Sequence, residues 1–337
     1  MRSTLTRYAG WLLIAGSACL FFFTVFAYHW QPDPLAAFTV LPPWIWGLVG
    51  ITAAVVGFFL LRHLPTLLLI AIWSIVALIS ADETKIISNL SHPKPKPGQP
   101  ASVDQHTPIR IITLNASLFR HDNPSADLAR WKPDIILLQE VAPIHVKQIT
   151  QSVFERDGHF RAYALNGIVS RWPIINEFRH DDPRFRPINY HVTIDHPDHG
   201  PIEIANLHYS SAATDLELWK RETWKTHRDH RRQRREEVAE TLRILEKNTS
   251  FPENQPVILG GDFNTPPHDT SLEPFHAHFT DAYDAVGRGW GNTYHRRLPL
   301  FRIDQIYLSK HFAPARCRAV TTRHSDHRFV VADVLIK

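Results

Sequence analysis

Three long stretches without a charged residue open this chain of 337 residues. They run from Tyr8 to Pro32, from Pro34 to Leu61 and from Leu64 to Ala81. A helix needs about 20 apolar residues to cross the roughly 30 Å hydrocarbon core of a bilayer. From Asp82 onward, charged residues appear at the density that is usual for a soluble domain. We therefore predict a membrane anchor over residues 1–82 and a water-soluble domain after it.

The predicted anchor contains three transmembrane helices, over about residues 8–30, 45–61 and 64–80. Trp11 and Trp30 stand near the two ends of the first helix, where tryptophan anchors a span at the membrane interface. A secretory signal peptide is the alternative for this stretch, because Arg2 and Arg7 precede it. The apolar stretch is long for a signal peptide and two more follow, so a retained helix is favoured.

Lysine and arginine accumulate in the short loops that stay in the cytoplasm, and this bias predicts the orientation. Arg2 and Arg7 precede the first predicted helix, and Arg62 lies between the second and the third. With three spans, these positions face the cytoplasm and the soluble domain faces outward, as in an integral protein of the inner or plasma membrane. Two spans would reverse this orientation.

A proline-rich segment over residues 83–108 separates the anchor from the soluble domain. Its second part, SHPKPKPGQPASVDQHTP, lacks apolar periodicity and is typical of a semi-extended linker. The net charge of the whole chain is +4 at pH 7, which suits an anionic substrate or an anionic membrane surface without requiring either. Two distant cysteines do not indicate a disulfide framework.

Apolar runs divide the soluble part, residues 109–337, into predicted strands. The strands are Ile109–Asn115, Asp134–Val141, Gly167–Ser170, Tyr190–Ile194, Ile202–His208, Pro256–Asp262, Arg302–Leu308 and Phe329–Ile336. One long helix is predicted over Leu216–Lys247, where Val238, Leu242 and Leu245 form a core-facing stripe. Many strands with few long helices indicate two packed sheets flanked by helices.

Polar residues that can bind metal or move protons stand at the ends of these strands. They are Asn115, Glu140, His208, Asp262, Asn264, Asp304, Asp326 and His327. A strand end is rigid but reaches solvent, so it is a good position for a functional side chain. Each residue alone is weak evidence, because a glutamate at a strand end usually lies on the surface.

In combination, the motifs GGDFN, RID and SDH follow in that order after LQE and a strand that ends in asparagine. This pattern resembles the endonuclease/exonuclease/phosphatase superfamily, which includes abasic-site endonucleases, deoxyribonuclease-I-like enzymes, neutral sphingomyelinases and inositol polyphosphate 5-phosphatases. The resemblance covers Ile109–Lys337. It implies an α/β fold, a four-layer sandwich of two packed mixed β-sheets flanked by helices, and hydrolysis of phosphoester bonds with Mg²⁺ or Mn²⁺.

The resemblance also implies a metal site. Glu140 matches the family's metal-binding glutamate, and hard oxygen ligands of this kind suit Mg²⁺ or Mn²⁺. Asn115 matches the asparagine of the first strand, near the metal and the phosphate. Asp326 matches the acidic residue that completes the metal site.

Five further residues match catalytic positions. Asp262 would orient or deprotonate the attacking water, and Asn264 would hold the phosphate or that water, with strand alternation bringing both to one side. His327 would donate to the phosphoryl oxygens while Asp304 orients its ring. His208 matches a histidine of the deoxyribonuclease and sphingomyelinase branches, which assists the leaving group.

Three more residues are candidates for substrate binding. Asn206 lies on the same strand face as His208, although a strand-edge hydrogen bond is an equally good interpretation. Arg231 and Arg235 belong to a basic run on the long helix, which could follow a nucleic-acid backbone or contact anionic lipid. The alternatives for this run are a solvated helix face or a structural role.

We therefore expect a membrane-anchored phosphodiesterase with nucleic acid as its leading substrate. Phospholipid or inositol phosphate is the second expectation, because the anchor brings the site to lipid. A catalytically inactive scaffold is the third, and it is disfavoured because every expected position carries the expected residue type. We infer no obligate protein partner.

Overall fold

The computed structural model describes residues 3–80, 97, 108–180, 182–185, 188–211, 215–249, 251 and 253–337. The chain forms two compact units. The first comprises residues 1–85 with 216–228, and the second comprises residues 86–215 with 229–337. The predicted linker at 83–108 lies outside the described residues, except for positions 97 and 108.

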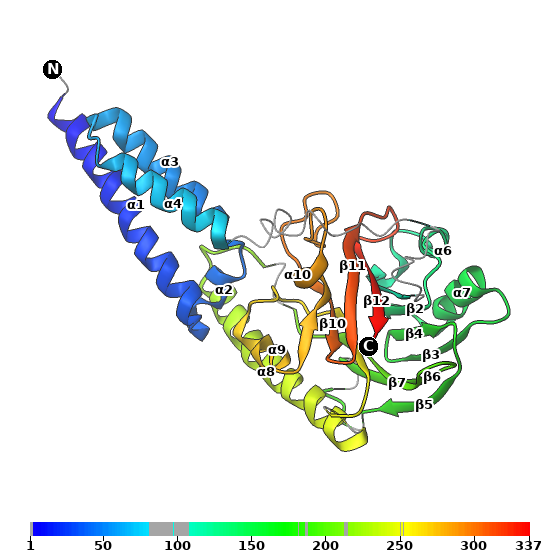
Figure 1. Ribbon diagram of the computed structural model, residues 1–337. Coiled ribbons are helices and arrows are strands. Elements are labelled where there is room, and N and C mark those ends of the chain that lie inside the picture. The colour runs from blue at the N-terminus through cyan, green and yellow to red at the C-terminus, as the bar shows by residue number, and fades with distance from the viewer. Residues whose placement is uncertain are drawn as a thin grey trace. The chain divides into compact units, whose positions relative to one another are not determined.

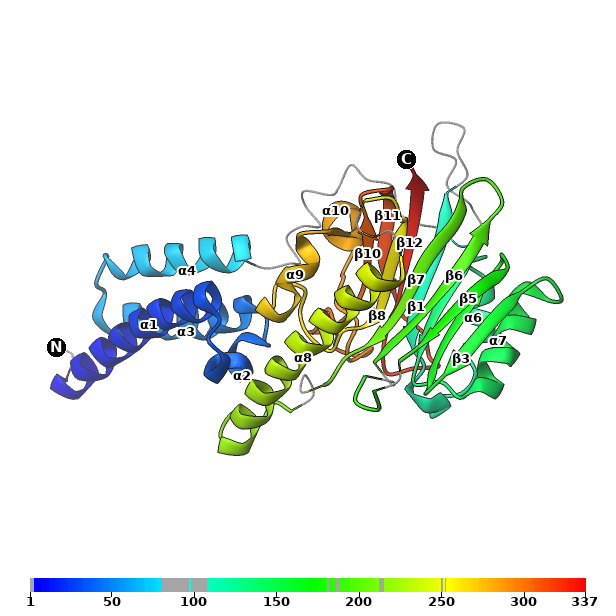
Figure 2. The same cartoon turned by 90° about the horizontal axis from the view of Figure 1, so that it is seen from below.

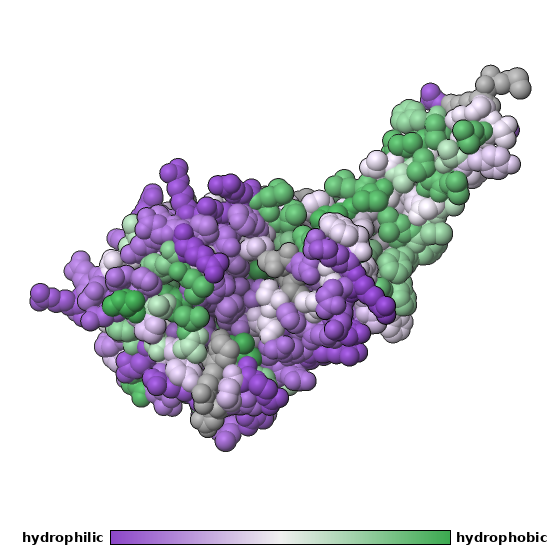
Figure 3. All heavy atoms as spheres, turned by 180° about the vertical axis from the view of Figure 1, so that it is seen from behind, coloured by the Kyte–Doolittle hydropathy of each residue, from purple (hydrophilic) through white to green (hydrophobic). Residues whose placement is uncertain are grey.

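Apolar helices make up most of the first unit. They are α1 (Thr4–Trp30), η1 (Asp33–Leu35), α2 (Ala36–Thr39), α3 (Pro43–Leu61) and α4 (Thr66–Ser80). By length and composition, α1 and α3 could cross a membrane, whereas α4 is shorter. Their surface is largely hydrophobic, in contrast to the mostly hydrophilic surface of the second unit (Figure 3). The three predicted helices are therefore present, and their insertion in a membrane stays a prediction.

A buried serine joins the three long helices of the first unit. Ser17 Oγ on α1 donates to the Gly50 carbonyl on α3 at 2.8 Å and accepts from Trp73 Nε1 on α4 at 3.1 Å. A Cβ at Gly50 would lie 2.2 Å from the Trp73 ring, so only glycine allows this approach. Small residues and buried hydroxyls at helix contacts are typical of helices that pack in a membrane.

Two six-stranded sheets form the centre of the second unit (Figure 1). The first has the order β11 (Phe312–Val320), β12 (Phe329–Ile336), β1 (Ile109–Asn115), β2 (Ile135–Gln139), β4 (Asn166–Ser170) and β3 (His159–Tyr163). The second has the order β5 (Ile174–Arg179), β6 (Asn189–His196), β7 (Gly200–His208), β8 (Val257–Asp262), β10 (Asp304–Ser309) and β9 (Phe279–Asp281). Each sheet is mixed, with one parallel pair, β1–β2 in the first and β7–β8 in the second.

Helices cover the outer faces of the sheets (Figures 1 and 2). The remaining elements are η3 (Ser117–Phe119), α6 (Ser125–Ala129), α7 (Pro143–Phe154), α8 (Arg221–Asn248), η4 (Thr270–Leu272), α9 (Glu273–His276) and α10 (Ala282–Val286). Leu128 of α6 and Val146 of α7 pack on the first sheet, and Val238 and Leu245 of α8 pack on the second. A separate apolar cluster fills the space between the sheets. The predicted four-layer α/β sandwich is confirmed.

Candidate active site

The strand register brings the predicted site residues to one end of the sandwich. On the second sheet, Asp262 of β8 pairs with His208 of β7 on one side and with Asp304 of β10 on the other. On the first sheet, Asn115 ends β1 and Glu140 directly follows β2. The polar residues therefore meet because neighbouring strands end, or begin, at the same level.

Asn115 connects the two sheets. Its Nδ2 donates to Glu140 Oε1 at 3.1 Å and to Asp262 Oδ2 at 3.0 Å, and its Oδ1 accepts from the Ser117 backbone N–H at 2.9 Å. Glu140 has a φ of 50°, an uncommon conformation for a residue other than glycine. Its carbonyl accepts from the Leu118 N–H at 2.9 Å, which fixes the turn. With a third of its side chain exposed, Glu140 is held by the protein and still open to a ligand.

His327 and Asp304 form a buried pair. His327 Nδ1 donates to Asp304 Oδ2 at 2.9 Å. Burial lowers the pKa of His327, but the carboxylates of Asp304, Asp262 and Asp326 outweigh it and raise the pKa to about 10. The ring is therefore an imidazolium at neutral pH, with its Nε2 turned towards Asp262.

Asp262 lies between two imidazoles. Its Oδ2 is 3.9 Å from His327 Nε2 and 3.9 Å from His208 Nε2, and it also accepts from Asn115. Burial, followed by the charge of Asp304, raises the pKa of Asp262 to about 6, against the opposing effect of the two histidines. A carboxylate with a pKa near the working pH is suited to accept a proton from water.

Asn264 lies beside Asp262, as predicted, but a turn and not strand alternation places it there. Strand alternation does not place it, because β8 ends at Asp262 and Asn264 has a left-handed φ of 52°. Its backbone N–H donates to Asp262 Oδ1 at 2.9 Å, and its Nδ2 donates to the Tyr209 carbonyl at 2.8 Å. Asn264 is thus fixed by an Asx turn rather than by the strand.

Two serines that the motifs did not single out organise the Asp326 side of the site. Ser117 Oγ hydrogen-bonds to the Asp326 carboxylate and lies 2.9 Å from Ser325 Oγ. Ser325 Oγ in turn donates to the Asn115 carbonyl at 2.6 Å. Burial raises the pKa of Asp326, but the Ser117 hydrogen bond and the charge of His327 outweigh it and hold that pKa below its ordinary value. The only sequence signal was their position, Ser117 two residues after Asn115 and Ser325 directly before Asp326.

The donor atoms of the site fit a hard divalent cation. Glu140 and Asp326 offer carboxylate oxygens. Asn115 offers an amide that is hydrogen-bonded directly to Glu140 and is connected to Asp326 through Ser117. Asp262, Asp304 and His327 also form a group whose ligand atoms lie within 4.8 Å of one another. That group is the poorer metal site, because the Nδ1 of His327 is bound to Asp304 and a protonated imidazole does not bind metal.

Asn206 lies between the two sheets and not at the solvent-exposed surface of the site. It is fully buried, and its Nδ2 donates to the carbonyls of Leu138 at 2.8 Å and Gly167 at 3.1 Å on the opposite sheet. Its Oδ1 accepts from Gln139 Nε2 at 2.5 Å. These contacts support the hydrogen-bonding interpretation of Asn206 over substrate binding.

The two arginines of the basic run differ from each other. Arg231 is only 1% exposed, and its Nε and Nη2 donate to Asp269 Oδ2 at 2.9 and 2.7 Å. Arg235 is exposed and lies 3.5 Å from Thr270 Oγ1. The structure therefore supports a structural role for Arg231 and leaves Arg235 accessible to an anion.

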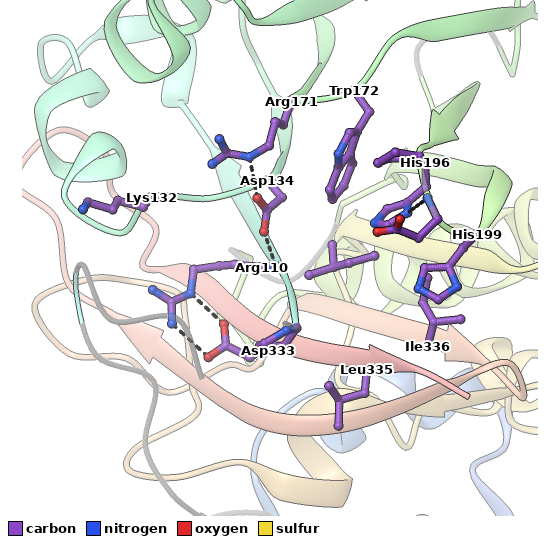
Figure 4. Close-up of a pocket in the computed structure, with 14 residues that line it drawn as sticks. Arg110, Lys132, Asp134, Arg171, Trp172, His196, His199, Asp333, Leu335 and Ile336 are labelled. Carbon is purple, nitrogen blue, oxygen red and sulfur yellow. Dashed lines mark hydrogen bonds and ion pairs between the residues drawn. The ribbon is translucent and has the colours of Figure 1, made fainter. Parts of the chain in front are cut away.

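A cavity of about 670 Å³ lies at the opposite end of β1 and contains none of the predicted site residues (Figure 4). Two ion pairs line it, between Arg110 and Asp333 at 2.6 Å and between Arg171 and Asp134 at 2.7 Å. The predicted site residues gather instead at the end of the sandwich where β1 and β2 terminate.

The chain is similar to one protein family and to several proteins of known structure. The chain matches the Endonuclease/Exonuclease/phosphatase family over residues 112–327. Similar solved structures include a protein of unknown function from Enterococcus faecalis (TM-score 0.53, 17% identity, 68% of this chain and 100% of that chain). A mannosyl-6-phosphatase from Bacteroides thetaiotaomicron has a TM-score of 0.52 and 16% identity, and covers 68% of this chain and 100% of its own.

A third similar structure is D. rerio TDP2 in complex with a single-strand DNA product (TM-score 0.51, 16% identity, 68% of this chain and 100% of that chain). No curated protein matches the chain in sequence. At these identities the solved structures show the fold, whereas the family match spans all the motifs from the first strand to His327. This chain therefore belongs to the endonuclease/exonuclease/phosphatase family and is a phosphoester hydrolase.

Proposed function

We propose that the protein is a divalent-metal-dependent phosphodiesterase that is held at a membrane by its N-terminal helices. The observation that carries this proposal is the position of Asp262, 3.9 Å from each of the two imidazoles His208 and His327 and hydrogen-bonded to Asn115. Asp262 can accept a proton from water, the His327 imidazolium can donate a hydrogen bond to the phosphate, and His208 can protonate the leaving oxygen. Hydrolysis of a phosphodiester needs these three functions.

In the proposed reaction, a water attacks phosphorus and passes a proton to the Asp262 carboxylate. The His327 imidazolium, held by Asp304, donates a hydrogen bond to a phosphoryl oxygen as negative charge increases there. The bond between phosphorus and the leaving oxygen breaks, and His208, which is partly exposed, is placed to give that oxygen its proton. Asn264 orients the water or the phosphate beside Asp262.

Enzymes of this family use divalent metal ions. Glu140, together with Asn115 and Asp326, would hold the ion in this chain, and Mg²⁺ or Mn²⁺ suits these oxygen donors. The bound ion would neutralise charge on the non-bridging phosphate oxygens.

The membrane part of the proposal rests on α1 and α3, which are long and apolar enough to span a bilayer. Their packing with α4 around Ser17 and Gly50 supports a stable helical bundle rather than a single removable leader. We take α4, the shorter apolar helix, as the third span, and with three spans the catalytic unit lies outside the cytoplasm. Among the similar structures, TDP2 with its DNA product supports a nucleic-acid substrate, and the mannosyl-6-phosphatase supports a sugar phosphate.

The experiment uses full-length protein in detergent with Mg²⁺ or Mn²⁺, and compares a soluble phosphodiester, bis(p-nitrophenyl) phosphate, with the monoester p-nitrophenyl phosphate. We expect hydrolysis of the diester, its loss on chelation, and a fall of at least about a hundredfold in Asp262→Asn and His327→Gln. Asp198→Asn, an exposed position on the β6–β7 turn, is the matched control. Equal rates in wild type, Asp262→Asn and His327→Gln would refute the proposal.

A further inference from the structure

Three large aliphatic side chains stand on the segments next to Glu140 and are exposed to solvent. Leu118 is 42% exposed, Ile144 is 59% exposed and Leu165 is 48% exposed. Backbone hydrogen bonds tie them to one place, because the Leu118 N–H donates to the Glu140 carbonyl at 2.9 Å and the Val141 N–H donates to the Leu165 carbonyl at 3.0 Å. Ile144 follows in the first turn of α7. We call Leu118, Ile144 and Leu165 the aliphatic rim.

A stacking contact joins the two segments that carry Leu118 and Ile144. The ring of Phe119, next to Leu118, stacks on that of His145, next to Ile144, with centroids 4.0 Å apart. The turn after β1, which carries Leu118, and the start of α7, which carries Ile144, are therefore packed together.

Two rim leucines occupy backbone positions that leucine disfavours. Leu165 is the second residue of the two-residue turn between β3 and β4, where Ala164 has a φ of 47° and Leu165 a φ of 67°. Asn-Gly is the favoured pair in such a turn. Leu118 likewise has a φ of 53°. Leucine there carries both backbone strain and exposed apolar surface, a combination that indicates a functional constraint rather than folding.

Cationic side chains accompany the rim. Arg120 lies two residues beyond Leu118, and Arg297 and Arg323 lie on the loops that flank Asp326. These loops are joined to the site, because the Arg296 N–H donates to the Asp326 carbonyl at 2.7 Å. In the part of the chain that the structure describes, the guanidinium groups of Arg120, Arg297 and Arg323 are exposed and have no carboxylate partner. Asp122, two residues after Arg120, is exposed and carries the opposite charge.

We propose that the aliphatic rim docks on the surface of an anionic bilayer, and that the phosphodiester brought to Glu140 and Asp262 belongs to a membrane phospholipid. This inference rests on the proposed phosphodiesterase activity. Aliphatic side chains enter the boundary between headgroups and acyl chains, while arginines meet the lipid phosphates. A single-stranded nucleic acid would instead be met by aromatic side chains on which bases stack. The apolar helices α1 and α3 would hold the protein at a membrane, and the aliphatic rim would contact the membrane surface.

The test uses full-length protein reconstituted in phosphatidylcholine vesicles, with and without phosphatidylglycerol. Two rates are measured for each variant, release of phosphorylated headgroup from the vesicle lipid and hydrolysis of soluble bis(p-nitrophenyl) phosphate. Leu118→Asn and Leu165→Asn are combined, because asparagine tolerates the left-handed backbone and removes the apolar side chain. Ile175→Asn is the matched control, since Ile175 is 57% exposed on β5, next to Ile174, which pairs with the far end of β6.

We expect the ratio of the lipid rate to the soluble rate to fall about tenfold or more in the double variant and to stay at the wild-type value in Ile175→Asn. In the wild type, this ratio should rise when the vesicles contain phosphatidylglycerol. An unchanged ratio in the double variant would overturn the inference. So would a wild type that hydrolyses bis(p-nitrophenyl) phosphate and plasmid DNA but no vesicle lipid, an outcome that leaves the proposed phosphodiesterase activity standing. A wild type inactive on every phosphodiester would remove the proposed function itself.

Discussion

Asp304 holds His327 through a hydrogen bond of 2.9 Å from Nδ1 to Oδ2, although the two residues come from a strand start and a loop 23 positions apart. The second carboxylate oxygen of Asp304 is buried without a hydrogen-bond partner among the described residues. The Asp304 carboxylate therefore interacts with the His327 imidazole, fixes the orientation of the ring and stabilises its charged form.

Replacing Asp304 with asparagine is expected to lower kcat by about 10²–10⁴-fold with little change in KM, because an amide can still hold the ring but does not stabilise an imidazolium. Steady-state kinetics on bis(p-nitrophenyl) phosphate measure this split, with Asp198→Asn as the control. A variant with wild-type kcat would show that the pair only supports the fold.

The inner strands were predictable and the edge strands were not. All eight predicted strands are present, and they are the four inner strands of each sheet. The strands missed were β3, β5, β9 and β11, which are the four sheet edges. An inner strand is covered on both faces and appears as an apolar run, whereas β3 and β5 are largely exposed and carry no such run.

The site was predictable where a strand end sets the position of a side chain. Glu140, Asp262, Asp304 and His327 meet as their motifs implied. Asn264 and Ser117 depend on left-handed turns, with φ values of 52° and 48°, and periodicity carries no signal for such turns. The buried partner of Arg231, Asp269, lies 38 positions away in the sequence, so the run of basic residues does not predict this ion pair.

Ser117 is expected to control metal affinity through Asp326. Ser117→Ala removes the hydroxyl that holds the Asp326 carboxylate, so the Mg²⁺ concentration for half-maximal activity should rise about 10–100-fold while activity recovers at high Mg²⁺. A Mg²⁺ titration of the rate measures this change. Ser152→Ala, at an exposed position on α7, should leave the titration unchanged. Equal curves for both variants would exclude a role for Ser117 in metal binding.

Arg231 is expected to matter for stability rather than for substrate. Arg231→Ala removes the guanidinium that donates two hydrogen bonds to Oδ2 of the buried Asp269 carboxylate, and should lower the free energy of unfolding by about 3–5 kcal/mol. The exposed Arg235→Ala should change it by less than about 0.5 kcal/mol. Denaturant unfolding of the full chain in detergent, followed by tryptophan fluorescence, compares the two. Unchanged stability with a raised KM in Arg231→Ala would instead identify a substrate contact.

The same ion pair predicts how stability depends on acid. Burial raises the pKa of Asp269, but Arg231 and Arg234 outweigh it, so the pKa in the folded protein lies below its ordinary value. A carboxylate with a depressed folded pKa binds more protons when unfolded, so its contribution is complete above the unfolded pKa of about 4 and is lost as pH falls below it. The Tm of wild type should therefore fall more steeply between about pH 5 and pH 3 than that of Asp269→Asn, which has no proton to bind. The exposed Asp198→Asn should keep the wild-type slope, and parallel slopes in wild type and Asp269→Asn would show that the pair does not carry this acid sensitivity.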